Sequence, residues 1–342
     1  MFGADALMFG APDTDFSLIN TTKAKSTGVA FYGQGTYTFS TKFDITGGLR
    51  YDSEKKKQSV LGEYQKDPDP NPVFEYRGDT AATASFNAFS PKVSLAYHST
   101  PQNTLYLTYS KGFRAGGLTS LNPDPSSPAL YAFKPEHSNN IEIGNKARLL
   151  DNKLTLNVSA FYSTVTDVQV PTLILPDAIT VTSNTGELTS KGFEAEINSA
   201  LAKGLELNYS FGYTDAEYYS LKVSQNNTEV DLKGKKQIFT PDVTSLLAAQ
   251  YSIGIAQNNT SRIVLRGEWK YLGKQYFDLA NSIEQPAYSL FNASTTVSIK
   301  SYSIMLWGRN LAGKKYVSYA YDFGAVHLGN PFTYGATLVA RF

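Results

Sequence analysis

The last twelve residues of the chain, Pro331–Phe342, read PFTYGATLVARF and alternate between two kinds of side chain. One set is apolar or aromatic and comprises Phe332, Tyr334, Ala336, Leu338, Ala340 and Phe342. The other set is mostly small or polar and comprises Thr333, Gly335, Thr337, Val339 and Arg341. A period of two residues is typical of a β-strand with one apolar and one polar face.

Two environments suit such a strand, because its apolar face can cover a soluble core or contact lipid. Phe332 and Phe342 are ten residues apart in the sequence. At about 3.3 Å per residue and a tilt of about 45°, they are separated by roughly 23 Å along a membrane normal, close to the ~25 Å apolar band of an outer-membrane barrel. A single strand is compatible with both environments. Whether the pattern repeats along the chain distinguishes a soluble core from a membrane barrel.

The alternation recurs along the chain, for example in VAFYGQGTYTF (29–39), LELNYSFGYT (205–214) and RIVLRGEWKY (262–271). About thirteen such segments follow residue 28 when the sequence is matched to an alternating template. In a barrel, the apolar sets are expected to point outward and the polar sets inward. The outward set includes Tyr209, Phe211, Leu265, Trp269, Tyr334 and Leu338, and the inward set includes Glu206, Arg266, Glu268, Thr337 and Arg341.

The connections between these segments alternate between short and long. Short turns are predicted near 41–42, 99–103, 151–153, 201–204, 257–260 and 301. Longer polar connections are predicted at about 53–85, 116–136, 171–187, 219–237, 279–286 and 312–329. Outer-membrane barrels have short periplasmic turns and long extracellular loops. The pattern therefore predicts an all-β, antiparallel transmembrane β-barrel wall of about 13–14 strands rather than a sandwich or propeller, with no helix of consequence.

Composition narrows the function classes. The chain of 342 residues has no cysteine, which excludes disulfides, thiolate metal sites and cysteine nucleophiles. Its formal net charge of +1 argues against a nucleic-acid partner. No run of about 18 apolar residues is present, so a transmembrane helix is not expected. The histidines His98, His137 and His327 have no metal-ligand spacing, and neither a nucleophile elbow nor a phosphate-binding loop occurs.

Five motifs follow one another in the order typical of one receptor family. They are LYLTYSKGFRAGG (105–117), HSNNIEIGNKARLLDNKLTLNVSAFYS (137–163), SKGFEAEI (190–197), LWGRNLAGKKY (306–316) and GNPFTYGATLVARF (329–342). In this series the chain resembles TonB-dependent outer-membrane receptors over most of residues 29–342. The resemblance implies a 22-stranded barrel, plugged by an N-terminal domain, that takes up scarce nutrients such as ferric siderophores.

The chain departs from that family in the number of its strands, because about thirteen is short of 22. We interpret residues 29–342 as the C-terminal part of a receptor barrel and residues 1–28 as the remnant of an extracellular loop. The segment 14–25 alternates only weakly, so no full closing strand is expected there, and the terminal strands at 29–40 and 331–342 should not pair with each other. The resemblance implies that the plug and the segment that contacts the TonB complex belong to the whole receptor, and that this part alone does not transport.

The predicted function is TonB-energised uptake, across the outer membrane of a Gram-negative bacterium, of a ferric siderophore or a similar chelate. The expected partners are outer-membrane lipid, the TonB complex, the barrel-assembly machinery and a small-molecule ligand, with no cofactor and no nucleic acid. One alternative is a complete passive porin of about fourteen strands. An outer-membrane enzyme is a further alternative, which the lack of a Ser/His constellation disfavours.

Candidate site residues are few. Arg114, in KGFRAGG, is a candidate ligand contact from the loop side, although the sequence favours snorkelling or pairing within the barrel wall. Arg309 and Asn310, in WGRNL, are possible ligand or lumen contacts that close a hydrogen-bond network near the loop end of their strand. Tyr334 and the terminal Phe342 are the expected barrel-assembly signal. No catalytic, cofactor-binding or metal-binding residues are expected.

Overall fold

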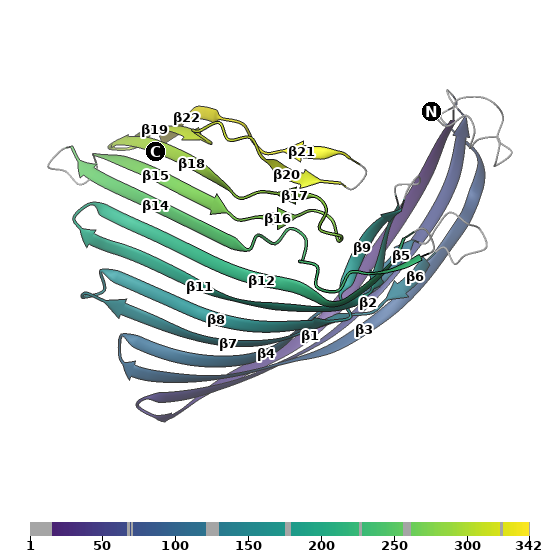
Figure 1. Cartoon of the computed structure of the whole chain (residues 1–342), viewed down its shortest axis with the longest axis horizontal. Helices are drawn as coiled ribbons and strands as arrows, with labels where there is room; N and C mark the ends of the chain where they lie inside the picture. Colours follow the sequence, from purple (N-terminus) through teal and green to yellow (C-terminus); the bar gives the residue numbers. More distant parts are fainter. Residues whose placement is uncertain are drawn as a thin grey trace.

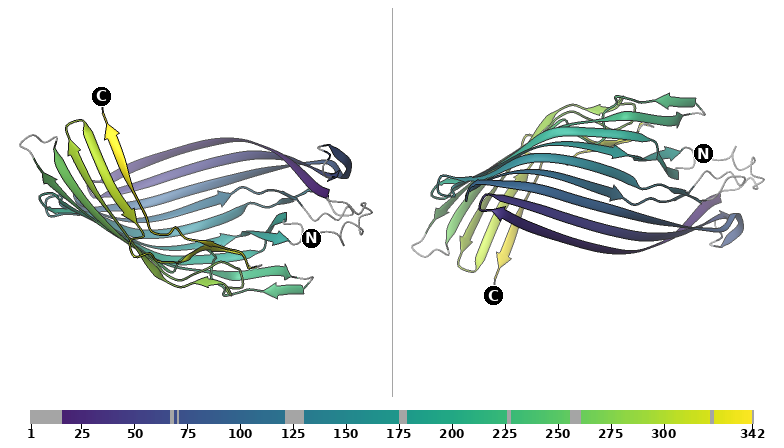
Figure 2. Two further views of the ribbon diagram at one scale, coloured as in Figure 1. Left: turned by 90° about the horizontal axis from the view of Figure 1, so that it is seen from above. Right: turned by 90° about the horizontal axis from the view of Figure 1, so that it is seen from below.

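The alternating segments of the sequence form long antiparallel strands in one curved sheet (Figures 1 and 2). The computed structural model describes residues 16–66, 69, 71–120, 130–174, 179–225, 228–255, 261–321 and 324–341. Within these ranges the main sheet has fourteen strands, of which thirteen follow one another in chain order and β13 lies beside β12. An all-β antiparallel wall of the predicted size is therefore confirmed.

Each strand of the main path pairs with its predecessor and successor along that path, which is the topology of an up-and-down wall. The strands are β1 (Phe16–Ser40), β2 (Phe43–Lys66), β3 (Pro72–Thr100), β4 (Asn103–Arg114), β7 (Glu136–Leu149), β8 (Leu154–Thr166), β11 (Gly186–Ala202), β12 (Leu205–Gln225), β14 (Val243–Gly254), β15 (Arg262–Leu272), β18 (Tyr288–Ile299), β19 (Tyr302–Arg309) and β22 (Thr333–Ala340). In the part of the chain that the structure describes, no helix is long and apolar enough to cross a membrane.

One end of the sheet carries the short connections, as the sequence predicts. Two residues separate β1 from β2 and β3 from β4, and four separate β7 from β8, with comparable turns before β12 and β19. In the turn after β7, Leu150, Asp151 and Asn152 all have positive φ angles (52°, 54° and 65°), a conformation that Asn and Asp tolerate better than most residues. All short connections therefore lie at the same end of the sheet.

The opposite end carries the long connections, and these are more regular than expected. Four of them contain small two-stranded hairpins. These hairpins are β5 (Gly117–Ser120) with β6 (Leu130–Phe133), β9 (Gln169–Ile174) with β10 (Ile179–Asn184), β16 (Gln275–Tyr276) with β17 (Glu284–Gln285), and β20 (Val317–Ala320) with β21 (Val326–Leu328). The connection after β12 adds β13 (Thr228–Asp231), which pairs back onto β12.

The predicted loop at 53–85 is wrong in extent. β2 and β3 continue as a paired ladder to Lys66 and from Pro72, so only the Asp/Pro-rich tip lies outside the strands. A lysine-rich segment has weak strand propensity, but pairing along its whole length with two neighbours overrides that preference. The Asp and Pro residues predicted where the turn at the tip lies. The polar composition of the flanking residues did not show where the strands end.

Of the segment interpreted as a loop remnant, residues 1–15 lie outside the described residues and residues 16–28 are strand. Residues 16–28 are the first half of β1 and pair with β2 from Lys66 down to Glu54. Residues 14 and 15 of the weakly alternating segment lie outside the described residues; its remainder, residues 16–25, forms no separate closing strand, as predicted, but it is strand rather than loop. Its partner is β2, the next strand in the sequence, and β1, β2 and β3 together extend far beyond the other strands of the sheet (Figure 1).

The sheet has two edges, β1 and β22. Among the described residues no ladder joins these two strands, which confirms the prediction that they are not neighbours. Figure 1 shows β22 at the top and the turn between β1 and β2 at the bottom. In lipid, each unpaired backbone group costs several kcal/mol, so both edges need partner strands in a membrane.

The register of the sheet separates an apolar from a polar face. Leu247 lies opposite Tyr209 on one side and Trp269 on the other, and directly paired residues point to the same face. One residue earlier, Leu246 lies opposite Ser210 and Lys270. The polar face is also the face of Glu206, Gln250 and Arg266, which occupy one cross-strand row. The predicted alternation is confirmed by these rows.

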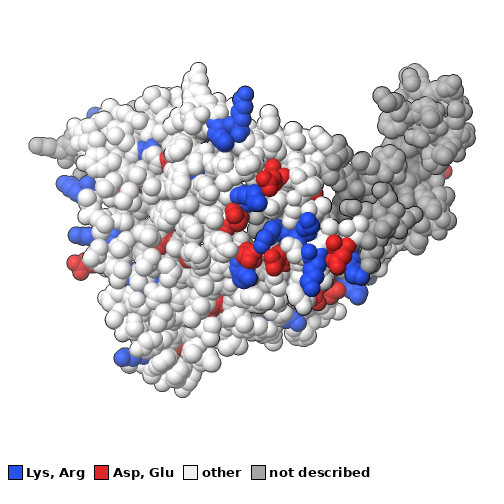
Figure 3. Space-filling view, viewed as in Figure 1, with Lys and Arg blue, Asp and Glu red and all other residues white. Residues whose placement is uncertain are grey.

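Residues of the apolar face are exposed rather than packed in a core. Leu265 is 43% exposed, and Tyr334 and Leu338 are 79% and 75% exposed. On the surface shown in Figure 3, most of the area over the strands is uncharged, and Lys, Arg, Asp and Glu gather toward the two ends. An uncharged band between charged ends is the surface expected of a wall that faces lipid. We call this surface the outer face.

The opposite surface, the lumen face, carries charged residues along the length of the strands. Arg266 donates to Glu268 at 2.7 Å, and Glu268 also accepts from the Asn292 amide. The Tyr106 hydroxyl donates to Glu142 at 2.6 Å, and the Lys146 ammonium lies 5.6 Å from the centre of the Tyr106 ring. Polar groups therefore satisfy one another across strands, as the sequence predicts for lumen charges.

Candidate functional site

A polar junction lies where β4 and β7 meet the long connections. Arg114 is the last residue of β4 and lies opposite Glu136, the first residue of β7. The glycines that follow Arg114 allow the β5–β6 hairpin to approach closely. A Cβ at Gly116 would lie 2.2 Å from the Phe133 carbonyl oxygen, so the backbone could not take this path with a larger residue.

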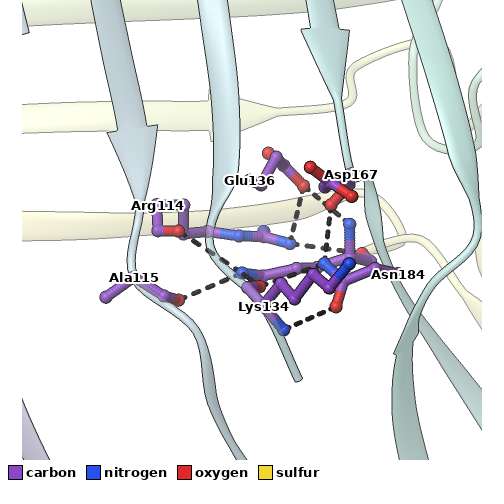
Figure 4. Close-up of polar contacts among 7 residues, drawn as sticks. Arg114, Ala115, Lys134, Glu136, Asp167 and Asn184 are labelled. Atoms are coloured by element: carbon purple, nitrogen blue, oxygen red, sulfur yellow. Dashed lines mark hydrogen bonds and ion pairs between the residues drawn. The ribbon is translucent and has the colours of Figure 1, made fainter. Parts of the chain in front are cut away.

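Arg114 and Glu136 are bound to each other (Figure 4). Both are also bound to Gln169 from the next connection. The Arg114 guanidinium donates to Glu136 at 3.2 Å and to the Gln169 carbonyl oxygen at 3.2 Å. The Gln169 backbone N–H donates to the same Glu136 carboxylate at 2.8 Å. This triangle fixes the guanidinium, although 59% of the Arg114 side chain remains exposed.

Gln169 is the buried centre of the junction, since only 8% of it is exposed. Its side-chain amide donates to the carbonyl oxygens of Ala115 and Lys134, each at 3.0 Å, and to that of Arg114 at 3.4 Å. One side chain therefore satisfies backbone acceptors on both arms of the β4–β7 connection. Buried acceptors without such a donor would be costly, so Gln169 holds the two connections together.

Asn184 closes the junction from the end of β10. Its amide donates to the carbonyl oxygens of Lys134 and Asp167 at 3.0 and 2.7 Å, and its oxygen accepts the Lys134 backbone N–H at 2.6 Å. Farther out, the Tyr131 hydroxyl donates to the Thr182 carbonyl oxygen at 2.9 Å. The β5–β6 and β9–β10 hairpins thus form one connected unit.

An apolar cluster supports this unit from the loop ends of β11 and β12. The buried members come from four successive segments of the chain and are Val168, Val170, Leu188, Tyr218, Leu221, Val223 and Leu232. Leu221 is fully buried, with 0% exposure. A packed cluster of this kind gives the connections a fixed position relative to the strands.

Asn310 organises a second junction at the loop end of β19. It is 4% exposed and has a positive φ of 49°. Its amide nitrogen donates to the carbonyl oxygens of Lys314 and Asn330 at 2.9 and 3.0 Å, and its oxygen accepts the Lys314 N–H at 2.8 Å. Its own N–H donates to Asn292 at 3.0 Å. Through these bonds, the Asn310 side chain fixes the shape of the connection that carries β20 and β21.

Arg309, one residue earlier, faces the lumen. Its guanidinium lies 5.1 Å from the centre of the Trp307 ring, a cation–π contact on the same strand. Trp307 lies opposite Ser294, in the cross-strand row that includes Arg266. The hydrogen-bond network predicted near this strand end is present around Asn310, whereas Arg309 contacts an aromatic ring.

The lumen face below these junctions contains an open hollow of about 470 Å³. Its lining includes Tyr106, Ser159, Glu194 and Lys270 from the polar rows. Gly144 makes room for the Tyr106 side chain, because a Cβ there would lie 2.5 Å from that ring. The arrangement offers hydroxyl, carboxylate and ammonium groups to a polar solute below the loop-side guanidinium of Arg114.

The predicted site residues thus lie in separate places. Arg114 belongs to the first junction, and Arg309 and Asn310 belong to the second. Tyr334 lies on the outer face and stacks on Phe332, with ring centres 5.7 Å apart. Phe342 lies outside the described residues. The ligand roles of Arg114 and Arg309 and the assembly role of Tyr334 and Phe342 stay predictions.

Gln169, Glu136 and Asn184 were missed by the sequence reasoning. Gln169 is 55 residues from Arg114 in the sequence, and no pattern links the two positions. The one available signal was a lone polar residue between Val168 and Val170 at the end of a strand. Within the described ranges, no group of three His, Cys, Asp or Glu side chains is placed to hold a metal ion.

The connection between β16 and β17 should lose order in acid. Burial opposes ionisation of Asp278, but the N–H groups of Ile283 and Ser282 and the Ser282 hydroxyl donate to it and hold its pKa below the ordinary value. A lowered pKa stabilises the folded connection above the pKa of the unfolded chain, about 4. That contribution is lost as the pH falls through the lower folded pKa.

We therefore expect the Ser282 and Ile283 amides to lose protection from hydrogen exchange in acid, relative to Asp278→Asn measured at the same pH. Asn cannot ionise, so the comparison removes the intrinsic pH dependence of exchange. Identical pH profiles of protection for the parent and Asp278→Asn would contradict the role of this carboxylate.

Comparison with known proteins gives one family. The sequence model described as "TonB dependent receptor-like, beta-barrel" matches residues 3–311. The metal-pseudopaline receptor CntO of Pseudomonas aeruginosa strain PAO1 is 23% identical over 329 residues, which are 95% of this chain and 42% of that protein. The ferrioxamine receptor of Yersinia enterocolitica is 26% identical over 259 residues, covering 74% of this chain and 33% of the receptor.

Solved structures agree on the fold. The ferric yersiniabactin uptake receptor FyuA from Yersinia pestis superimposes with a TM-score of 0.76 at 21% identity, over 95% of this chain and 47% of FyuA. The ferric-catecholate import receptor Fiu from Escherichia coli K12, in its closed form, gives a TM-score of 0.70 at 18% identity. The chain spans less than half the length of these relatives.

Proposed function

This chain belongs to the TonB-dependent receptor β-barrel family, and from that premise we propose that it forms the ligand-facing wall of a receptor that imports a metal–chelator complex. The family consists of transporters, not enzymes, and resides in the outer membrane of Gram-negative bacteria. Relatives of this chain are named as receptors for metal-pseudopaline, ferrioxamine and ferric yersiniabactin. These names motivate the ligand class for this chain.

The observation that carries the proposal is the position of Arg114. Its guanidinium is held in place by Glu136 and Gln169 while more than half of the side chain stays exposed. A fixed, exposed guanidinium suits recognition of a carboxylate or a similar oxygen group on a chelate. Below it, the polar lumen face offers further partners. The short-turn end of the sheet then lies in the periplasm and Arg114 faces the cell exterior.

The edges of the sheet motivate a second part of the proposal. β1 and β22 need partner strands in lipid, and the relatives are more than twice as long as the region they share with this chain. We propose that further strands, a plug and a segment that contacts the TonB complex complete the whole receptor. A closed passive porin made of this chain alone finds no support in the described sheet, because no ladder joins its edges.

Uptake of a radiolabelled ferric siderophore by intact cells tests the function. Cells that lack the gene should accumulate less label than the parent from at least one siderophore in a panel, and a protonophore should remove the difference. Arg114→Gln should raise the half-saturating concentration by about tenfold, the effect of losing one charge-assisted contact. Arg114→Lys should recover part of the loss because it keeps the charge.

Lys111→Gln is the matched control, since Lys111 is a cation on the same strand but lies opposite Asn139 on the outer face. It should leave uptake unchanged. Equal accumulation with and without the gene across the panel, or accumulation insensitive to the protonophore, would contradict the proposed function. An unchanged half-saturation for Arg114→Gln would refute only the role of Arg114.

A further inference from the structure

Four lysines form a basic patch on the first hairpin of the sheet. Lys23 and Lys25 lie on β1, and Lys55 and Lys57 lie on β2. Lys25 is directly opposite Lys57, while Lys23 and Lys55 lie one step to either side, opposite Ser59 and Thr27. All four residues are exposed. We call them the lysine patch.

The lysine patch lies on the outer face. Along β1, Lys23 and Lys25 share their face with Val29 and Phe31, because residues two apart along a strand point the same way. Phe31 lies opposite Tyr51, and the Tyr51 ring packs on Phe89 at 4.8 Å between centres. Phe31 and Phe89 are 72% and 61% exposed, as expected of an aromatic border of the lipid-facing band.

The distance from this border places the patch at the level of lipid headgroups. Lys55 is four residues beyond Tyr51 along β2, and Lys57 is six residues beyond it. At about 3.3 Å per residue and a tilt of about 45°, these positions are roughly 9 and 14 Å above Tyr51 along the membrane normal. Since this is the long-connection end of the sheet, the headgroups are those of the outer leaflet.

Within the described ranges, no protein anion neutralises the patch. Among the described residues, none of the four lysines forms an ion pair or a side-chain hydrogen bond. Other lysines do: Lys56, on the lumen face of β2, pairs with Glu54 at 3.5 Å, and Lys191, on the outer face of β11, pairs with Asp215 at 3.4 Å. Like charges directly opposite each other destabilise a strand pair, so the patch would gain from an external anion.

We propose that the lysine patch binds the phosphate groups of a phosphorylated glycolipid in the outer leaflet. Four ammonium groups on adjacent strands can surround phosphates at headgroup depth, while the acyl chains of the same molecule cover Phe31, Tyr51 and Phe89 below. Depth and charge together point to a lipid rather than to a soluble anion, which would need no neighbouring apolar surface. The proposal rests on the barrel orientation given above and is independent of the imported ligand.

The test uses the full-length gene product, purified in detergent micelles, and fluorescent diphosphorylated lipid A as the probe. Binding is measured by fluorescence anisotropy at low ionic strength, because salt screens exposed charges. Lys55→Gln/Lys57→Gln should weaken binding by about tenfold or more, from the loss of two headgroup contacts. Lys56 lies between Lys55 and Lys57 in the sequence but on the opposite face of the sheet. The control variant Lys56→Gln should therefore change binding less than twofold.

Two further arms identify the source of the phosphate. The same glycolipid without phosphates should bind at least tenfold more weakly to the parent, and millimolar inorganic phosphate should not displace the probe. Equal binding of both glycolipids, displacement by inorganic phosphate, or equal loss in Lys56→Gln and the double variant would each overturn the proposal. Heat-dependent gel mobility reports folding, and Lys55→Arg/Lys57→Arg, which keeps both charges, should retain binding if the Gln variant fails to fold.

Unchanged siderophore uptake in the Lys55→Gln/Lys57→Gln variant would leave the proposed import intact. The two proposals therefore fail separately.

Discussion

Leu247→Arg is expected to destabilise the membrane-inserted protein by about 2–4 kcal/mol, whereas Leu246→Arg is expected to cost less than about 1 kcal/mol. The two leucines are neighbours on β14 and are equally exposed, at 40% and 39%. They differ in their face: Leu247 lies between Tyr209 and Trp269, and Leu246 between Ser210 and Lys270. An arginine at 247 must enter lipid, but an arginine at 246 meets the polar lumen.

Denaturant unfolding from lipid vesicles, with the full-length protein, measures both free energies. Because size and helix or strand preference change equally in the two variants, their difference isolates the environment of the side chain. Equal destabilisation by the two arginines would mean that the faces do not differ in polarity. Greater destabilisation by Leu246→Arg would reverse the assignment of the faces.

Asn310→Ala is expected to destabilise the connection between β19 and β22 by about 3–6 kcal/mol. The alanine removes three buried hydrogen bonds to Lys314 and Asn330, each worth about 0.5–1.5 kcal/mol. It also places a Cβ-bearing residue without a polar side chain at φ 49°, a conformation that costs about 1–2 kcal/mol. Hydrogen exchange of the β20 and β21 amides reports the loss.

Asn310→Gly separates the two causes. Glycine adopts positive φ freely, so this variant keeps the backbone and loses only the amide. Its destabilisation should be smaller than that of Asn310→Ala, and the difference between the two variants should be about 1 kcal/mol. Protection of both variants at the parental level would show that the Asn310 amide does not hold the connection.

The two-residue periodicity of the sequence predicted most of the fold. The alternation in 205–214 and 262–271 identified strands, faces and register parity, because a slip of one residue would reverse every side chain. The short turns were equally visible, since Asp151 and Asn152 are residues that tolerate positive φ. These features are local, and local features can be read from one sequence.

Long-range contacts could not be read in the same way. The β2–β3 extension looked like a loop because its lysines have weak strand propensity, and the pairing that overrides propensity is a tertiary effect. The Arg114–Gln169 contact joins two connections through residues 55 apart, with no motif in common. Arg114 was therefore a candidate from its motif, whereas the residues that fix it became visible only in the structure.

The central claim is that alternate residues of each strand face lipid and a water-filled lumen. The chain has no cysteine, so single cysteines can be introduced on β12 and spin-labelled in the membrane without background. Labels at Tyr209 and Phe211 should collide with dissolved oxygen, and labels at Asn208 and Ser210 with a water-soluble nickel chelate, with a period of two residues. Nickel accessibility without that period, or oxygen accessibility at Asn208 and Ser210 instead, would contradict the account.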